Sequence, residues 1–171
     1  MKKTVTAIVG LILALPTFAQ TQEISSTANL EEAFKTCNLM VNPMAMDLIR
    51  SVADRQIKTA FPNRYKGVTP VTLFLNDDTP DLVEASATLK EAPSIAGLQP
   101  KELVATTCRE ACDYAVWTLN FGPLDLAGYQ QLQAWVWRAE RQQVRTNPEH
   151  PVVTLHKEAD GNIALSCNLS V

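Results

Sequence analysis

Residues 101–121 read KELVATTCREACDYAVWTLNF, and this stretch decides the fold because it fits either one long helix or two paired strands. Residues four apart on a helix hold their Cβ atoms about 5–6 Å apart, whereas a disulfide needs Cβ atoms roughly 3.5–4.5 Å apart. A helix would therefore force Cys108 and Cys112 to pair elsewhere. Because threonine, valine and aromatic residues also favour strands, we predict a hairpin in which Trp117 and Phe121 share one face.

The N-terminal residues 1–19 predict a secretory signal peptide, because two lysines precede a short apolar run and small residues follow it at positions 17 and 19. The apolar run, residues 7–15, is shorter than the roughly 20 residues that cross a bilayer. No cysteine follows the cleavage site, so no lipid anchor is expected. We expect residues 20–171 to form a single exported, soluble domain without a membrane anchor, and the short leader with paired lysines indicates the bacterial periplasm.

All four cysteines lie after the predicted leader, and in an oxidising compartment they predict two disulfides. The sequence alone does not choose their connectivity; we predict a local Cys108–Cys112 loop and a Cys37–Cys167 staple between the two ends of the chain. A long closed loop contributes about 4–5 kcal/mol by restricting the unfolded chain. A thioredoxin-type redox site requires Cys-x-x-Cys, and Cys108 and Cys112 are one residue too far apart, so both disulfides are predicted to be structural.

Two helices are predicted at the start of the mature chain. The first spans residues 29–41 and begins with Asn29 and Glu32 as a capping box. The second spans residues 42–60, with Asn42 as its N-cap and a proline in its first turn. The residues of the first helix expected to face inward, at helical spacing, are Leu30, Phe34, Cys37 and Val41.

The rest of the chain predicts a small antiparallel sheet and one more helix. Residues 71–75 are β-branched and apolar, which predicts a strand, whereas residues 82–89 fit a strand or a helix equally well. Asp125 can cap a helix that runs to about residue 145. The C-terminus predicts a hairpin of residues 152–157 and 163–171. The predicted fold is therefore α+β and disulfide-braced, with two N-terminal helices, a sheet of hairpins, and one further helix before a C-terminal hairpin.

The charge of the chain excludes two classes of partner. The whole sequence carries a net charge of −3; without the two leader lysines, 13 basic residues face 18 acidic ones, a net charge of −5. A chain this acidic has no electrostatic attraction for nucleic acid or for an anionic membrane surface.

Motifs of the common enzyme classes are absent from the sequence: it has no Gly-x-Ser-x-Gly elbow, no His-Glu-x-x-His pair and no glycine-rich phosphate loop. No cofactor or metal is predicted. One alternative is a small hydrolase with a site assembled around His156 and a nearby carboxylate. The other is metal (copper) handling by soft sulfur ligands; its candidate ligands are Met40, Met44, Met46 and His150.

The predicted C-terminal helix carries two features of a binding surface. Trp135 and Trp137 are about 200° apart around a helix, so one face cannot bury both; exposed tryptophan is enriched at interfaces. The second feature is a row of arginines, which is either a solvated face or a docking strip for an acidic partner. The row consists of Arg138, Arg141 and Arg145.

The strand–Cys-loop–strand arrangement at Cys108 and Cys112 is similar to a loop of the periplasmic lysozyme inhibitors. Their loop bears a histidine, whereas the tip here is Arg109-Glu110-Ala111. The leading hypothesis is a non-enzymatic periplasmic protein that binds another protein, as an inhibitor, an immunity protein or an accessory of an envelope or secretion assembly. The candidate contact residues are Arg109, Glu110, Trp137, Arg138, Arg141 and Arg145.

Overall fold

The computed structural model describes residues 29–54, 65, 67–69, 72–75, 82–108, 115–146, 149 and 152–168, and the predicted α+β class is confirmed. The predicted signal peptide lies outside these residues. The described elements, in chain order, are α1 (Leu30–Lys35), the 3₁₀ helix η1 (Leu39–Val41), α2 (Pro43–Asp54), β1 (Thr72–Leu75), β2 (Leu82–Thr88), β3 (Glu102–Cys108), β4 (Ala115–Gly122), α4 (Leu126–Thr146), β5 (Thr154–Lys157) and β6 (Ile163–Asn168).

The central stretch forms the predicted hairpin. Strands β3 and β4 pair antiparallel, with Ala105 opposite Trp117 and Leu103 opposite Leu119. Cys108, the last residue of β3, is disulfide-bonded. Its predicted partner Cys112 and the tip residues 109–111 lie outside the described residues.

Six strands form one antiparallel sheet in the order β1-β2-β3-β4-β6-β5. Residues 82–88 are the strand β2, so the strand interpretation of that ambiguous stretch is right. Strands β5 and β6 form the predicted C-terminal hairpin, and β6 lies between β5 and β4. The described part of the sheet therefore ends at β5.

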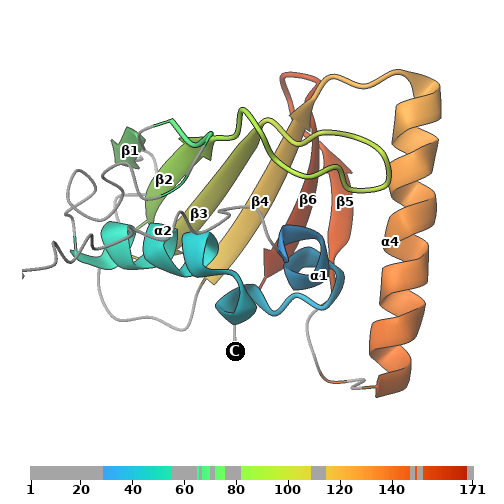
Figure 1. Cartoon of the computed structure of the whole chain (residues 1–171), viewed down its shortest axis with the longest axis horizontal. Coiled ribbons are helices and arrows are strands. Elements are labelled where there is room, and N and C mark those ends of the chain that lie inside the picture. Colours follow the sequence, from blue (N-terminus) through green and yellow to red (C-terminus); the bar gives the residue numbers. More distant parts are fainter. Residues whose placement is uncertain are drawn as a thin grey trace, which may run out of the picture.

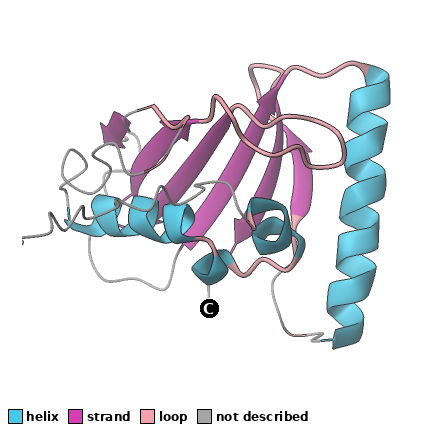
Figure 2. Cartoon of the chain, viewed as in Figure 1, coloured by secondary structure: helices cyan, strands magenta, loops and turns pink. Residues whose placement is uncertain are grey.

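The helices α1 and α2 cover one face of this sheet, and α4 stands beside the β5 edge (Figure 1). Helix α2 packs on β2 and β3, while α1 contacts β6 and α4. The connection between β2 and β3 is a loop that runs across the top of the helix layer toward α4 (Figure 2). Ile95 of this loop is fully buried, which holds the loop down on the core.

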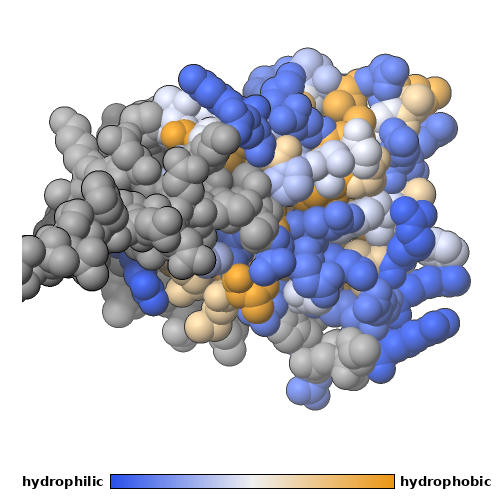
Figure 3. All heavy atoms as spheres, in the orientation of Figure 1, coloured by the Kyte–Doolittle hydropathy of each residue, from blue (hydrophilic) through white to orange (hydrophobic). Residues whose placement is uncertain are grey.

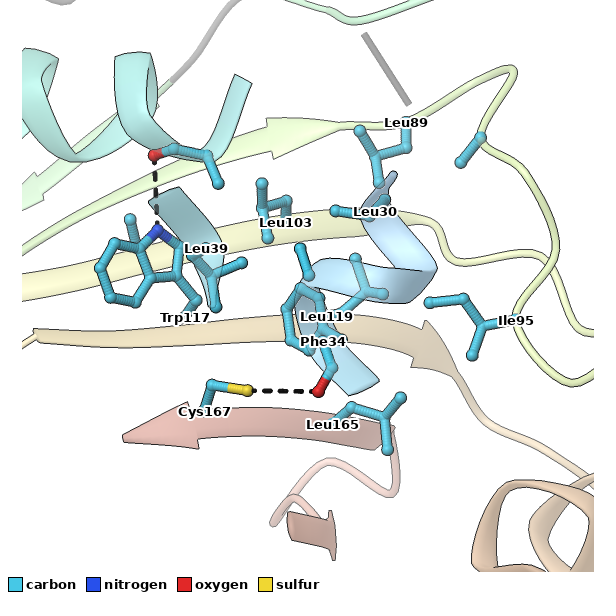
Figure 4. Packing of buried hydrophobic residues seen from close by; sticks show 14 of the residues in the cluster. Leu30, Phe34, Leu39, Leu89, Ile95, Leu103, Trp117, Leu119, Leu165 and Cys167 are labelled. Atoms are coloured by element: carbon cyan, nitrogen blue, oxygen red, sulfur yellow. Dashed lines mark hydrogen bonds between the residues drawn. The ribbon is translucent and has the colours of Figure 1, made fainter. Parts of the chain in front are cut away.

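The core lies between the helix layer and the alternate residues of the central strands, as the period of two along a strand requires. Leu103, Leu119 and Leu165 come from neighbouring strands and meet Phe34 from α1 (Figure 4). Trp117 is 4% exposed and its indole Nε1 donates a hydrogen bond to the Ala45 carbonyl oxygen at 3.4 Å. This bond ties β4 to α2.

The first predicted helix is wrong in three respects. It ends at Lys35, because Cys37 takes a left-handed backbone conformation (φ 46°) that no helix interior accommodates. Val41, expected inside, is 44% exposed because it lies beyond that break in η1. Asn29 also has a left-handed backbone (φ 69°) and its side chain makes no capping hydrogen bond, so the predicted capping box does not form.

The second N-terminal helix begins as predicted. The side-chain oxygen of Asn42 accepts a hydrogen bond from the Ala45 backbone N–H at 2.9 Å, and Pro43 occupies the first helical position. The described helix ends at Asp54, and residues 55–60 of the prediction lie outside the described residues.

The predicted Cys37–Cys167 disulfide is present, with a Cα–Cα distance of 5.4 Å and a sequence separation of 130 residues. Both cysteines are fully buried. The bond fastens the segment after α1 to β6, and so closes most of the mature chain into one loop.

Candidate functional site

Helix α4 begins where the sequence predicts. The Asp125 carboxylate accepts a hydrogen bond from the Gly128 backbone N–H at 2.8 Å, which satisfies one of the free N–H groups of the first turn. One side of the helix packs into the core through Leu132, Trp135 and Ala139, which are at most 7% exposed.

Two hydrogen bonds fix the position of α4 against the N-terminal segment. The Trp135 indole Nε1 donates to the Glu31 carboxylate at 2.9 Å, and Gln143 Nε2 donates to the Thr36 carbonyl oxygen at 2.6 Å. Trp135 and Gln143 are about two helical turns apart, so these hydrogen bonds fix both the position and the direction of α4.

Trp137 lies on another side of α4 and is 54% exposed. The expectation that one of the two tryptophans stays at the surface is therefore confirmed. The guanidinium carbon of Arg141 lies 3.7 Å from the centroid of the Trp137 ring. A cation–π contact of this kind contributes about 0.5–1 kcal/mol at an exposed site, and it holds the indole in place at the surface.

Trp137 borders a groove between α4 and the start of the C-terminal hairpin, with a volume of about 330 Å³. We call it the α4–β5 groove. Such a volume is at the lower end of the range for binding sites in proteins. The groove is lined by Tyr129, Gln133, Val136, Trp137 and Glu140 of α4, and by Val152, Val153, Thr154 and Leu155.

The walls of the α4–β5 groove are mainly apolar, although much of the surface around them is polar. Val136 and Leu155 from opposite walls pack against the edge of the core. On the face of the molecule drawn in Figure 3, hydrophilic side chains cover most of the region of α4, and apolar residues are scattered among them. The groove therefore offers an apolar contact beside a polar rim.

Only some of the predicted contact residues come together here. Trp137 lines the groove, and Arg141 contacts the Trp137 ring without lining the groove. Arg138 and Arg145 are exposed on the side of α4 opposite Val136, because a helix turns by about 100° per residue. Within the described residues, no carboxylate forms an ion pair with any of the three arginines. Arg109 and Glu110 lie outside the described residues.

The amino-acid sequence did not indicate the groove itself. Its second wall comes from residues 152–155, and no local pattern indicates that these residues lie beside α4. The one available signal was the short connection between α4 and β5, which is typical of neighbouring elements.

The geometry around His156 does not assemble a hydrolytic site from the described residues. His156 Nε2 lies 4.0 Å from Glu158 Oε1, but both side chains are at least one-third exposed and His156 does not line the groove. A hydrolase of this kind needs a nucleophile within hydrogen-bond reach of the histidine. In the parts of the chain that the structure describes, no hydroxyl bonds to His156; the nearby Ser166 and Thr118 hydroxyls bond to each other at 2.9 Å.

The methionines proposed for metal handling point into different environments. Met44 is fully buried in the core, whereas Met40 is 73% exposed, so the two do not face a shared site. Among the described residues, no group of three or more histidine, cysteine, aspartate or glutamate side chains is arranged to hold a metal ion. His150 lies outside them. No described helix is both long and apolar enough to span a bilayer.

Comparison of the chain with protein-family models, with curated proteins and with solved structures finds no match.

Proposed function

We propose that this chain is an exported, non-enzymatic protein of the periplasm that binds another protein through the α4–β5 groove. The observation that carries the proposal is Trp137, a large aromatic side chain 54% exposed at the rim of an apolar groove. Exposed aromatic residues of this kind are the usual anchors of protein interfaces, and removing one from a bound complex typically costs 2 kcal/mol or more.

The neighbours of Trp137 support the same function. Arg141 stacks on the indole, so the side chain is ordered before a partner arrives and less conformational entropy is lost on binding. Tryptophan and arginine are both enriched at the centres of interfaces. A rigid pair at the mouth of a groove is suited to recognition rather than to chemistry, because it contains no nucleophile and no general base.

The proposed compartment rests on the leader and the cysteines. Residues 1–19 have the pattern of a signal peptide, and the Cys37–Cys167 disulfide is of a kind that persists in an oxidising environment. A small disulfide-braced protein with one rigid contact surface suits an inhibitor, an immunity protein or an accessory of an envelope or secretion assembly.

Site-specific photo-crosslinking tests the proposal in cells that produce the full chain. The crosslinker p-benzoylphenylalanine replaces Gln133 in one variant, because Gln133 is exposed and lines the groove one turn from Trp137, which is kept. It replaces Met40 in a matched control, because Met40 is 73% exposed but belongs to η1, away from the groove. We expect a crosslinked species of defined mass from position 133 and none from position 40. The same yield from both positions, or no adduct from position 133, would overturn the proposal.

A further inference from the structure

Among the described residues that line the α4–β5 groove, one is charged, and its charge is negative. This residue is Glu140 of α4, and the other lining residues are all neutral. Glu140 is exposed, and in the part of the chain that the structure describes it forms no ion pair. A carboxylate at the rim of an apolar groove, without an ion-pair partner of its own, is therefore available to a positive charge on a ligand.

The positions around α4 place this carboxylate on the groove side of Trp137. Because a helix turns by about 100° per residue, Glu140 lies about 60° to one side of Trp137 and Arg141 about 40° to the other. Val136, which lines the groove and packs against the core, lies on the same side as Glu140. Arg141 contacts the Trp137 ring but does not line the groove. A ligand that enters the groove therefore meets Glu140 and not an arginine.

Beside Glu140 the groove offers apolar surface of the kind that covers the stem of a long side chain. Residues three and four positions apart are neighbours on a helix, so Glu140 adjoins both Trp137 and Val136. Lysine and arginine combine an apolar stem with a charged head, and they bury the stem on apolar surface while the head stays near water. One such side chain fits a groove of about 330 Å³ without displacing α4 from its place against β5.

The indole of Trp137 favours a cation in the same position. A positive charge over the face of an aromatic ring is attracted by it, most strongly over tryptophan. The Arg141 guanidinium carbon, 3.7 Å from the ring centroid, covers one face, yet Trp137 stays 54% exposed and lines the groove. Arginine suits this site better than lysine, since its planar guanidinium both stacks on aromatic rings and binds a carboxylate through two N–H groups.

The positive charges of the neighbourhood lie farther from the groove than Glu140. Arg138 and Arg145 are on the side of α4 opposite Val136, and neither of them nor Lys157 lines the groove. Salt screens interactions between exposed charges beyond about 8 Å at physiological ionic strength, so a contact with Glu140 outweighs repulsion from these side chains. At long range the chain as a whole carries a net charge of −3, which favours the approach of a basic partner.

We propose that the partner inserts a basic side chain, arginine in preference to lysine, into the α4–β5 groove. The charged head of this anchor binds Glu140, and its apolar stem lies along Val136 and Trp137. This inference rests on the proposed function and names the chemistry of the residue by which the partner is recognised. It differs from the acidic partner that the row of arginines indicates, because none of those arginines lines the groove.

The test keeps the crosslinker at position 133 of the full chain and changes the charge at position 140. Glu140→Gln removes the charge and keeps the size of the side chain and its helix propensity. Glu149→Gln is the matched control, because Glu149 is also exposed but does not line the groove. We expect the adduct yield to fall about three- to tenfold for Glu140→Gln and to change by less than about 1.5-fold for the control.

A charge exchange between the two proteins tests the contact directly. Mass spectrometry of the adduct identifies the partner segment linked to position 133, and this segment should contain an arginine or a lysine. Glu140→Lys should lower the adduct yield more than Glu140→Gln does, because like charges at an interface repel. Changing the basic residue of the partner to glutamate should then restore most of the yield with Glu140→Lys, which a general loss of folding would not allow.

The outcomes separate the two proposals. If position 133 gives an adduct but Glu140→Gln and Glu149→Gln give equal yields, or the charge exchange restores nothing, the basic anchor is wrong and the groove still binds a protein. A higher yield for Glu140→Gln also contradicts a basic anchor. An adduct with the mass of two copies of this chain, or no adduct from position 133, contradicts the proposed function itself.

Discussion

Trp135 and Trp137 show how two identical side chains take different roles two residues apart. Trp135 is 7% exposed and donates a hydrogen bond to Glu31, whereas Trp137 is 54% exposed and contacts Arg141. The helical rotation between the two positions directs the first indole into the core and the second to the groove. The first therefore contributes to folding, and the second is available for binding.

This difference in burial predicts unequal losses of stability for two matched substitutions. Trp135→Ala should lower the free energy of unfolding by about 3–5 kcal/mol, because it leaves a cavity and removes the partner of Glu31. Trp137→Ala should lower it by less than about 1 kcal/mol, since only an exposed cation–π contact is lost. Urea unfolding of the two variants measures both values. Similar losses in the two variants would contradict the assigned roles.

At the scale of elements, the sequence predicted the hairpin of β3 and β4 because two independent signals agreed there. The cysteine spacing is compatible with a Cys108–Cys112 disulfide only in the hairpin, and the residue types favoured strands. Local signals also placed α4 and the β5–β6 hairpin, since capping residues and turn residues act within a few positions along the chain.

Two predictions from the sequence, the C-terminal end of the first helix and the extent of the binding surface, were wrong or incomplete because they depend on contacts between distant parts of the chain. Cys37 follows the end of α1 with a left-handed backbone and forms the disulfide to Cys167, whereas the helical spacing of apolar residues continued through that position. The α4–β5 groove was likewise missed, because it arises from the packing of two elements that have no side-chain pattern in common. Long-range constraints of this kind override local propensity.

The junction between β4 and α4 depends on Gly122, the last residue of β4, and this predicts the effect of a substitution there. Its backbone is left-handed (φ 73°), and a Cβ there would lie 2.6 Å from Lys101 Nζ and 3.2 Å from Lys101 Cε. Gly122→Ala should cost about 1–2 kcal/mol of backbone strain and a small further loss from displacing the flexible end of the Lys101 side chain.

Gly97→Ala is the control for this prediction. Gly97 also has a left-handed backbone (φ 78°), but the nearest atom to an added Cβ is Gln131 Nε2 at 3.9 Å. The control should lose the backbone strain alone. The unfolding free energy measured by urea denaturation should therefore fall slightly more for the Gly122 variant, and an equal or larger loss at Gly97 would show that the Lys101 contact does not contribute.

At the scale of the whole molecule, the disulfide and the helix layer together determine which surface remains for binding. The Cys37–Cys167 bond fastens the segment after α1 to β6, and α1 in turn receives the Trp135 hydrogen bond from α4. The disulfide and this hydrogen bond together determine the position of α4 relative to β5. The width of the α4–β5 groove therefore depends on both. Loss of the disulfide should therefore weaken binding as well as folding.

The size of that stability loss follows from loop length. Replacing Cys37 and Cys167 together with alanine opens a loop with a sequence separation of 130 residues, which should cost about 4–5 kcal/mol and lower the melting temperature by roughly 10–15 °C. Replacing Cys108 and Cys112 together should cost only about 2 kcal/mol, because a Cys108–Cys112 bond would close a short local loop. Calorimetry of the two double variants measures the difference. Equal losses would contradict the dependence of the stabilisation on loop length.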